Sequence, residues 1–303
     1  MLTRHTCPVC ESPRVSHAFD APTTRSPRDG RRWSIWRCAD CTHGFLNPQL
    51  SWDDLAPFYS AGYSAYSATE GLERGLEATV EEARRRGEYR HVPVRSGTRL
   101  LDFGSGGGAF LEVVGRLGVR ARGVEPSEHA ARACRERGLD VFHGDIFGFA
   151  AAEPGARFDL ITASHVIEHT PDPVPVLRAM GTLLAPGGFI WIAVPNAGGF
   201  TARRLRGRWH STDVPLHLMQ FTPASARAGA ERAGLRVRSL CTYTLPAAMA
   251  SSLDAMLRQY LLMPAAIRRP FRPLVNLPAP ALARRLDRRG DGEAILMEMD
   301  TGP

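Results

Sequence analysis

The chain has 303 residues, of which 44% are hydrophobic and 23% charged, so it can bury a full core and we expect a globular protein. Its net charge is +7, but all 38 basic residues are arginine, which points to a coding bias and does not favour nucleic acid as a partner. We find neither an apolar leader nor a run of about 18 apolar residues, and therefore expect a cytoplasmic protein without a membrane span. The composition indicates no particular oligomeric state.

Residues 1–50 contain two cysteine pairs with CxxC spacing, Cys7-Pro8-Val9-Cys10 and Cys38-Ala39-Asp40-Cys41. Each pair forms a knuckle whose two thiolates can reach one ion, and two knuckles complete a tetrahedral four-cysteine zinc site. Such a site has no open coordination position, so we expect a structural Zn²⁺ in a small zinc ribbon, with free thiols as the alternative. The predicted ligands are Cys7, Cys10, Cys38 and Cys41.

Residues 51–95 carry an aromatic cluster followed by a charged helical stretch from about Thr69 to Arg90. The aromatic side chains are Phe58, Tyr59, Tyr63 and Tyr66. We interpret this part of the chain as a helical linker or lid.

From Thr98 onward, short apolar runs alternate with helix patterns, which is typical of a parallel sheet with crossover helices. The segments are Arg99–Phe103, Ala109–Leu117, Val119–Glu125, Ser127–Arg137, Leu139–His143, Phe158–Ala163, Pro173–Leu184 and Phe189–Val194. A helix over Thr222–Ala233 and a strand over Leu235–Leu240 follow, so we assign residues 96–245 to one α/β core. Residues 246–303 are interpreted as a helical cover plus a last strand over Ala294–Met299.

The first strand of this core leads into a glycine-rich loop, Asp102-Phe103-Gly104-Ser105-Gly106-Gly107-Gly108. Glycines at such a turn bring the backbone close to a ligand and aim helix N–H groups at it. Gly104, Gly106 and Ala109 also fit the dinucleotide pattern, so a nicotinamide enzyme is an alternative. Asp102 separates the two cases, because a carboxylate would repel a pyrophosphate but suits the ammonium and sulfonium of S-adenosylmethionine.

Two further acids stand where an adenosyl ligand needs them. Glu125 ends the second strand, where a carboxylate can accept both ribose hydroxyl hydrogens, and Asp145 follows the third strand and could accept from the adenine amino group. Taken alone, each acid could equally be a turn or helix-cap residue. The predicted cofactor site therefore consists of Asp102, Phe103, Gly104, Ser105, Gly106, Gly108, Glu125, Pro126, Asp145, Ile146 and His165.

The chain resembles the class I S-adenosylmethionine-dependent methyltransferases. The resemblance rests on these residues, on Phe158–Ile161 leading into His165–His169, and on the turn Leu184–Gly188. The resemblance implies a Rossmann-like seven-stranded sheet with a reversed last hairpin and SN2 transfer of the sulfonium methyl group. It also implies that Asp102, Gly104, Gly106 and Gly108 hold the methionine part, Glu125 the ribose and Asp145 the adenine. The cysteine pairs, with Gly44–Pro48 following, are similar to the N-terminal zinc ribbon of methyltransferases from sugar and natural-product pathways.

Methyl transfer to a hydroxyl or an acidic C–H requires a base or a metal at the acceptor. His165, Glu168 and His169 would share one face if the turn after the fourth strand were helical, and His217 could close over the same pocket. We take His217 as the candidate general base and His169 and His165 as further catalytic candidates. The resemblance extends to enzymes whose corresponding cluster binds a divalent metal, whereas helix capping or mutual pairing is the structural alternative. Asp213, Tyr63 and Tyr66 are weaker candidates for positioning the acceptor.

The acceptor is the least determined part of the function. The segment Ser164–Ile167 lacks the Asn-Pro-Pro-aromatic pattern of amine methylation, which favours an oxygen or carbon atom. The leading hypothesis is a methyltransferase acting on a small molecule, namely a sugar, a nucleotide sugar or a secondary metabolite. The alternatives are an RNA methyltransferase that uses the ribbon for docking and a non-catalytic zinc-ribbon adapter.

Overall fold

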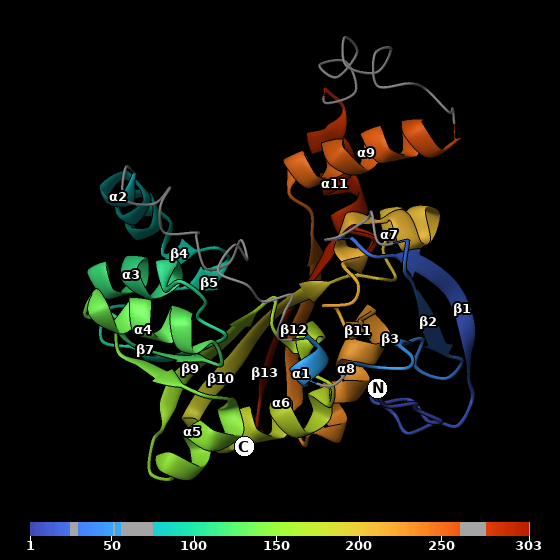
Figure 1. Cartoon of the computed structure of the whole chain (residues 1–303). Coiled ribbons are helices and arrows are strands. Elements are labelled where there is room, and N and C mark those ends of the chain that lie inside the picture. The colour runs from blue at the N-terminus through green and yellow to red at the C-terminus, as the bar shows by residue number, and fades with distance from the viewer. Residues whose placement is uncertain (25–29, 51, 56–74, 261–276, 303) are drawn as a thin grey trace.

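The computed structural model describes residues 1–24, 30–50, 52–55, 75–260 and 277–302. Two sheets organise these residues, a large one at the centre and a small one formed mainly by the N-terminal part of the chain (Figure 1). The aromatic cluster expected to contain Tyr63 and Tyr66 lies outside the described residues. None of the described helices is long and apolar enough to cross a membrane.

The large sheet has seven strands in the order β12-β13-β10-β9-β6-β7-β8. All strands run parallel except β13, which pairs antiparallel with both β10 and β12, so the expected sheet with a reversed last hairpin is confirmed. Buried apolar runs in its central strands match a sheet that helices cover on both faces. The strands are β6 (Arg99–Phe103), β7 (Arg120–Glu125), β8 (Val141–His143), β9 (Phe158–Ser164), β10 (Leu184–Pro195), β12 (Arg236–Tyr243) and β13 (Ala294–Asp300).

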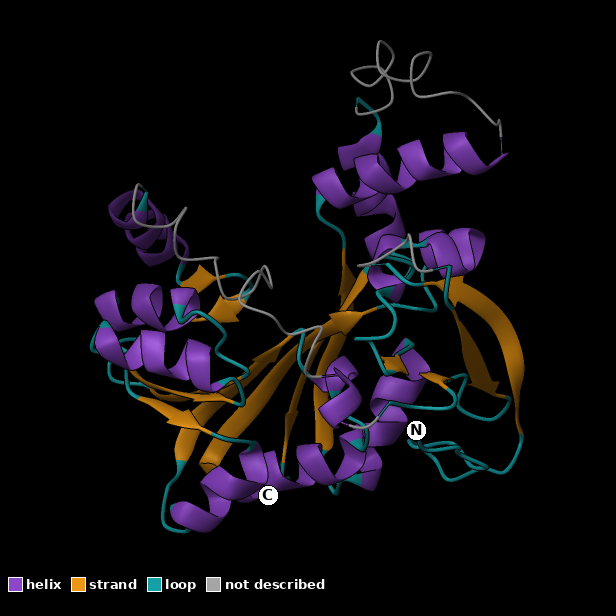
Figure 2. Ribbon diagram, in the orientation of Figure 1, coloured by secondary structure: helices purple, strands orange, loops and turns teal. Residues whose placement is uncertain are grey.

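Helices flank the large sheet on both sides, with α2, α3 and α4 on one side and α5, α6 and α8 on the other (Figure 2). Their starts have side-chain caps where the sequence provides them: Ser127 caps α4, and Thr222 with Ser225 forms a capping box on α8. The bounds are α2 (Leu76–Arg86), α3 (Ala109–Arg116), α4 (Glu128–Glu136), α5 (Ile146–Ala152), α6 (Pro173–Thr182) and α8 (Pro223–Arg232).

The small sheet has the order β1-β2-β3-β11, and its last strand comes from the α/β core. Gly44 permits this junction, because a Cβ there would lie 2.8 Å from the Gln220 Cβ atom. The N-terminal module is therefore continuous with the core through the segment that carries His217. The strands are β1 (Val15–Pro22), β2 (Arg32–Cys38), β3 (Gly44–Leu46) and β11 (Met219–Gln220).

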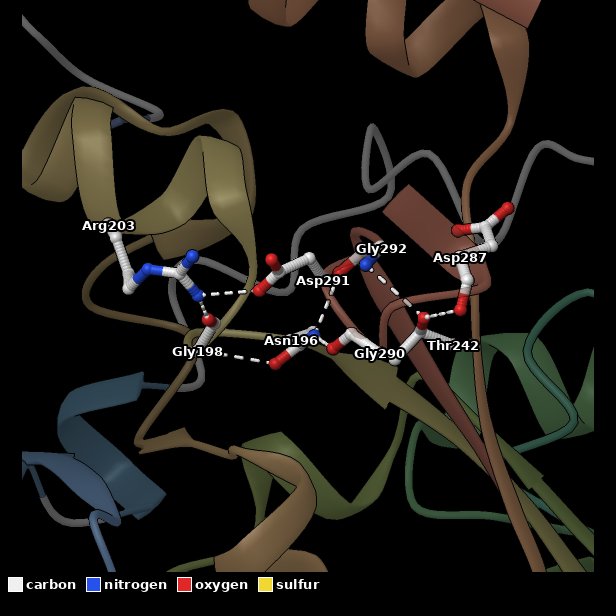
Figure 3. A network of polar contacts seen from close by, with 8 residues as sticks. All are labelled: Asn196, Gly198, Arg203, Thr242, Asp287, Gly290, Asp291 and Gly292. Carbon is white, nitrogen blue, oxygen red and sulfur yellow. Dashed lines mark hydrogen bonds and ion pairs between the residues drawn. The ribbon is translucent and has the colours of Figure 1, made fainter. Parts of the chain in front are cut away.

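The C-terminal helices α9 (Pro246–Tyr260) and α11 (Ala279–Asp287) pack on each other and cover α7 (Phe200–Leu205). Figure 3 shows how the turn before β13 is tied to the end of β10 and to α7. The Asn196 amide, just after β10, donates to the Gly292 carbonyl at 2.8 Å, and the Arg203 guanidinium on α7 pairs with Asp291 at 2.8 Å. The strands β4 (Glu88–Tyr89) and β5 (Val92–Pro93) form a two-stranded sheet beside α2 and α3 (Figure 1). The remaining short elements are α1 (Trp52–Leu55) and the 3₁₀ turns η3 (Ile167–His169), η4 (Arg206–Arg208) and η5 (His210–Thr212).

Candidate active site

The glycine loop lies at the carboxyl end of β6, which pairs with β7 on one side and β9 on the other. The chain continues from β6 to β7 on one side and later adds β9 on the other side, so the order in which strands are added to the sheet reverses at β6. Ligands of open α/β sheets bind at such a switch point. Gly104 has φ +77°, and a Cβ there would lie 2.4 Å from Val166, so a larger residue would be both strained and in collision. The backbone thus forms one wall of a pocket of about 180 Å³.

Asp102 presents a buried carboxylate to this pocket. Its side chain accepts a hydrogen bond of 2.7 Å from the Thr162 hydroxyl, and only 6% of the residue is exposed. Burial raises the pKa of Asp102 to about 7, although Thr162 and the charge of Arg90 act in the opposite direction. A cation bound beside Asp102 would favour its ionised form.

Glu125 organises the loop from the end of β7. One of its carboxylate oxygens accepts the Gly106 N–H at 2.8 Å and the other accepts the Ser127 N–H at 2.9 Å. Burial raises the pKa of Glu125 even though these two N–H groups lower it. Each carboxylate oxygen has a second lone pair, so these contacts leave acceptor capacity for ribose hydroxyls.

Asp145 acts as the N-cap of α5, where it accepts the Gly148 N–H at 2.7 Å, and its side chain is exposed. The structure therefore brings only part of the predicted cofactor set to the pocket lining. Phe103 and Ile146 are buried instead, because their apolar side chains belong to the main hydrophobic core. The residues that line the pocket are Asp102, Gly104, Ser105, Gly106 and His165; those that do not are Phe103, Gly108, Glu125, Pro126, Asp145 and Ile146.

Sequence reasoning missed Arg90, which lines the same pocket. It lies in the turn between β4 and β5, where Arg90 and His91 both have positive φ. No local sequence pattern predicts positive φ at two consecutive residues that are not glycine, asparagine or aspartate. With Asp102, Arg90 gives the pocket one anionic and one cationic side chain, a pair complementary to the zwitterionic amino-acid end of S-adenosylmethionine. Ser105 adds a buried hydroxyl oxygen with no hydrogen-bond partner among the described residues.

The histidines do not share a helical face as expected. The turn after β9 is the 3₁₀ helix η3, and His165 precedes it with φ +56°, so its side chain faces the cofactor pocket. Glu168, His169 and His217 come together instead, with their ligand atoms all within 4.8 Å of one another. His165 joins this group only through a contact of 3.2 Å between its Nδ1 and the Glu168 carboxylate.

Backbone carbonyls orient the two clustered imidazoles. His169 Nδ1 lies 3.1 Å from the Leu216 carbonyl, and His217 Nδ1 lies 2.8 Å from that of Ser211. A carbonyl only accepts, so both rings are assigned a proton on Nδ1 and a lone pair on Nε2. Burial lowers the pKa of His169 to about 4 and keeps that ring neutral.

Glu168 is the acidic member of this cluster and is completely buried. Burial alone would raise its pKa, but the hydrogen bond with His165 and the neighbouring histidines lower it. Its Oε2 atom has no partner among the described residues. The cluster thus combines a buried carboxylate with two imidazole nitrogens that carry lone pairs.

The four cysteines of the two CxxC pairs meet at one point between the start of β1 and the end of β2. Cys7 and Cys41 have their sulfur atoms 3.6 Å apart, and Cys10 and Cys38 have theirs 3.5 Å apart. Tetrahedral zinc with Zn–S bonds of about 2.3 Å requires sulfurs about 3.8 Å apart, so the four thiolates fit such an ion. Cys134 and Cys241 lie elsewhere.

The strand order, the glycine loop and the pocket beside it define a Rossmann-like methyltransferase fold. Residues 69–240, more than half of the chain, match the family described as a methyltransferase domain. The chain therefore belongs to this family, as a class I S-adenosylmethionine-dependent member.

Curated relatives share parts of this region. The chain is 29% identical over 158 residues to the ubiquinone biosynthesis O-methyltransferase of Bordetella pertussis, a match over 46% of this chain and 65% of that one. It is 38% identical over 104 residues to the protein of the same name from Ralstonia nicotianae, over 32% of this chain and 43% of that one. The matches thus span less than two thirds of these relatives.

Among solved structures, a chain of the complex between the Haloferax volcanii Trm112 methyltransferase activator and a methyltransferase aligns with a TM-score of 0.50 at 18% identity. The alignment covers 80% of this chain and 96% of that one. At this level of identity the likeness concerns the fold alone.

Proposed function

We propose that this protein transfers the sulfonium methyl group of S-adenosylmethionine to an oxygen atom of a small molecule. The observation that carries the proposal is the pocket at the switch point, in which the glycine loop, Asp102 and Arg90 surround one cavity. The names of the curated relatives support oxygen as the acceptor atom. Within this class we favour a sugar, a nucleotide sugar or a secondary metabolite, and an acidic carbon is the alternative acceptor because it needs the same base.

The pocket residues divide the cofactor between them. When bound, S-adenosylmethionine supplies an electrophilic methyl group that leaves neutral sulfur behind, so the protein need not activate the donor further. Asp102 would hold its ammonium group and Arg90 its carboxylate. Outside the pocket lining, Glu125 would accept from the ribose and Asp145 from the adenine. Gly104 and Gly106 let the backbone approach closely enough for these contacts.

His217 is the candidate general base. Its Nδ1–H donates a hydrogen bond to the Ser211 carbonyl, which leaves the Nε2 lone pair free to take a proton from the acceptor. Asp213 lies 3.9 Å from Nε2, and the Glu168 carboxylate belongs to the same cluster, so two carboxylates stabilise the imidazolium once Nε2 has taken the acceptor proton.

A divalent cation at Glu168, His169 and His217 is the second candidate for activating the acceptor. The unpartnered Oε2 of Glu168 supports it, because a buried carboxylate oxygen without a partner is costly. The chemistry of the donor set, one carboxylate and two imidazoles, suits several first-row metals. A bound cation would lower the pKa of an acceptor hydroxyl.

The function is tested by incubating the protein with methyl-labelled S-adenosylmethionine and a panel of catechols, sugars and nucleotide sugars. We expect label to move to an oxygen atom of one acceptor class, with NMR locating the new methyl group. Transfer that stops with chelator and returns with a divalent ion would assign activation to the metal, whereas chelator-resistant transfer would assign it to His217. Transfer to nitrogen alone, or to RNA alone, would contradict the proposal.

We expect Asp102→Asn to weaken S-adenosylmethionine binding by about ten- to a hundredfold at about pH 8, because the amide cannot pair with an ammonium group. The pKa of Asp102, raised to about 7 by burial, also sets a pH dependence. Below about pH 7 the carboxyl must lose its proton before it can form the ion pair, so wild-type affinity should fall by up to about tenfold per pH unit.

Titration calorimetry at several pH values measures both effects. The ligand's own amine titrates in the same way with both proteins, so the difference between the two profiles isolates Asp102. Glu128→Gln, which removes an exposed carboxylate from α4, serves as the matched control and should bind like wild type. An Asp102→Asn variant with wild-type affinity and an unchanged pH profile would remove Asp102 from the binding site.

A further inference from the structure

A second cavity lies between the N-terminal sheet and the segment that follows β10. Its volume is about 290 Å³, and it is separate from the cofactor pocket because the two share no lining residue. Its walls come from β1 and β2 on one side and from α7, η4 and the segment up to β11 on the other. The lining residues are Ala18, Phe19, Arg37, Ala197, Ala202, Arg203, Arg206, Trp209, Thr212 and Gln220.

Arg37 occupies an inward-facing position of β2. Trp33 and Ile35 precede it on the same face of the strand and are buried, so alternation places a cation where an apolar residue is expected. Burial and the charge of Arg206 lower the pKa of Arg37. No carboxylate pairs with Arg37 among the described residues, and none of the described residues that line the cavity is acidic.

The other polar groups of the wall are also mainly donors. Trp209 is 1% exposed, and its indole Nε1 has no partner among the described residues. Arg203 borders the cavity while its guanidinium contacts Asp291 and the Gly198 carbonyl, as Figure 3 shows. A half-buried cation without an ion-pair partner and a buried unpaired N–H are both costly unless an anion or acceptor meets them.

The backbone holds Arg206 over the cavity in a strained conformation. Arg206 has φ +48°, which a residue with a side chain rarely adopts. The next residue, Gly207, presses against β1, since a Cβ there would lie 2.7 Å from the Asp20 carbonyl oxygen and 2.8 Å from the Ala21 Cα. Strain of this kind persists where the surroundings impose it, and it clusters at ligand-binding positions.

We propose that this cavity binds the phosphate groups of a phosphorylated small-molecule acceptor, such as the diphosphate of a nucleotide-linked substrate. The inference rests on the proposed function and names the substrate class of the same enzyme. Arginine forks recognise phosphate oxygens in pairs, and the cavity lining takes Arg37 from β2 and Arg206 from η4. The cavity offers no described acidic group to repel a dianion.

The position of the cavity connects it with the candidate base. Trp209, Thr212 and Gln220 line it, while His217 lies on the same segment and is anchored to the Ser211 carbonyl beside Thr212. Gln220 in turn donates to the Thr212 carbonyl at 3.1 Å, which closes this segment into a compact unit. One short segment thus carries part of the cavity lining together with His217, so a phosphate bound in the cavity would hold the rest of the acceptor beside the histidine cluster.

Titration calorimetry with inorganic pyrophosphate, on protein saturated with S-adenosylmethionine, tests the site directly. We expect wild-type protein to bind pyrophosphate, and Arg37→Gln and Arg206→Gln each to weaken that binding by about ten- to a hundredfold. Arg206 is exposed, so its variant remains informative if loss of Arg37 disturbs folding. Arg208→Gln, on the same turn but outside the cavity lining, is the matched control and should bind like wild type.

Different experimental results would contradict this inference and the proposed function. Intact S-adenosylmethionine binding without pyrophosphate binding would overturn the phosphate site alone, as would equal binding of succinate or equal losses in all three variants. Pyrophosphate binding that depends on Arg37 and Arg206, without methyl transfer to any oxygen acceptor, would overturn the function and keep the site. Tighter binding of an RNA oligonucleotide than of pyrophosphate, through the same arginines, would overturn the small-molecule assignment.

Discussion

Replacing Cys38 with serine should abolish zinc binding and unfold the N-terminal sheet. The four cysteine sulfurs lie within 4.8 Å of one another, so loss of one thiolate leaves three ligands and a broken tetrahedron. Structural zinc contributes about 10–16 kcal/mol to the folding of small metal modules, which matches or exceeds the stability of a whole domain. We therefore expect the metal content to fall from about one equivalent to none, with a markedly lower thermal midpoint.

The damage should extend beyond the ribbon, because β11 belongs to the same sheet. Met219 and Gln220 pair with Phe45 and Gly44, so an unfolded ribbon releases the segment that carries His217. Metal analysis and thermal unfolding by circular dichroism measure the effect. Cys241→Ser removes an exposed cysteine outside the cluster and serves as the control. Wild-type protein that contains no zinc, or Cys38→Ser protein that keeps its metal and its midpoint, would contradict the assignment.

The large sheet could be predicted because its signals are local. Short apolar runs such as Leu100–Phe103 alternate with amphipathic helices, and Gly104 and Gly108 mark the turn in which only glycine fits. The order of the strands and the reversal of β13 came from resemblance to a family, since no periodicity states which strands are neighbours. Family and fold therefore followed from residues that lie close together in the sequence.

A site residue could be predicted only where its residue type, at that place in the fold, has a single common role. Asp102 reaches the pocket because it ends a strand at the switch point, whereas Asp145 has the equally common use of a helix cap. Arg90 depends on an unusual turn with positive φ at two consecutive residues. Spacing alone placed His165 with Glu168 and His169, but a 3₁₀ turn has a different period and left His165 facing the cofactor pocket.

The junction between the two sheets also escaped prediction. β11 has two residues, too few for any alternation to appear, and its pairing with β3 is set by contacts between distant parts of the chain. This junction has a structural consequence, because pairing with β3 fixes the β11 end of the segment that carries His217. The N-terminal sheet therefore holds the segment that carries the proposed base, in addition to bringing the four cysteines together.

His217→Ala should lower the turnover number by about 10²- to 10⁴-fold while leaving the affinity for S-adenosylmethionine unchanged. His217 is not among the residues that line the cofactor pocket, so its loss does not disturb the contacts to the methyl donor. Its imidazole is fixed by the Ser211 carbonyl at 2.8 Å and packs edge-on against His169 with ring centroids 4.7 Å apart. Alanine removes the imidazole whose Nε2 would take the acceptor proton.

Steady-state kinetics and calorimetry on the same preparation separate the two quantities. His210→Ala removes an exposed histidine from the neighbouring turn η5 and is the matched control, expected to keep the wild-type turnover number. Unchanged turnover in His217→Ala would exclude His217 as the base. Activity in His217→Gln that recovers with added divalent ion would instead identify the histidine as a metal ligand, because an amide oxygen can coordinate a cation but cannot act as a base at neutral pH. A variant that loses turnover irrespective of added ions assigns the proton transfer to the imidazole itself.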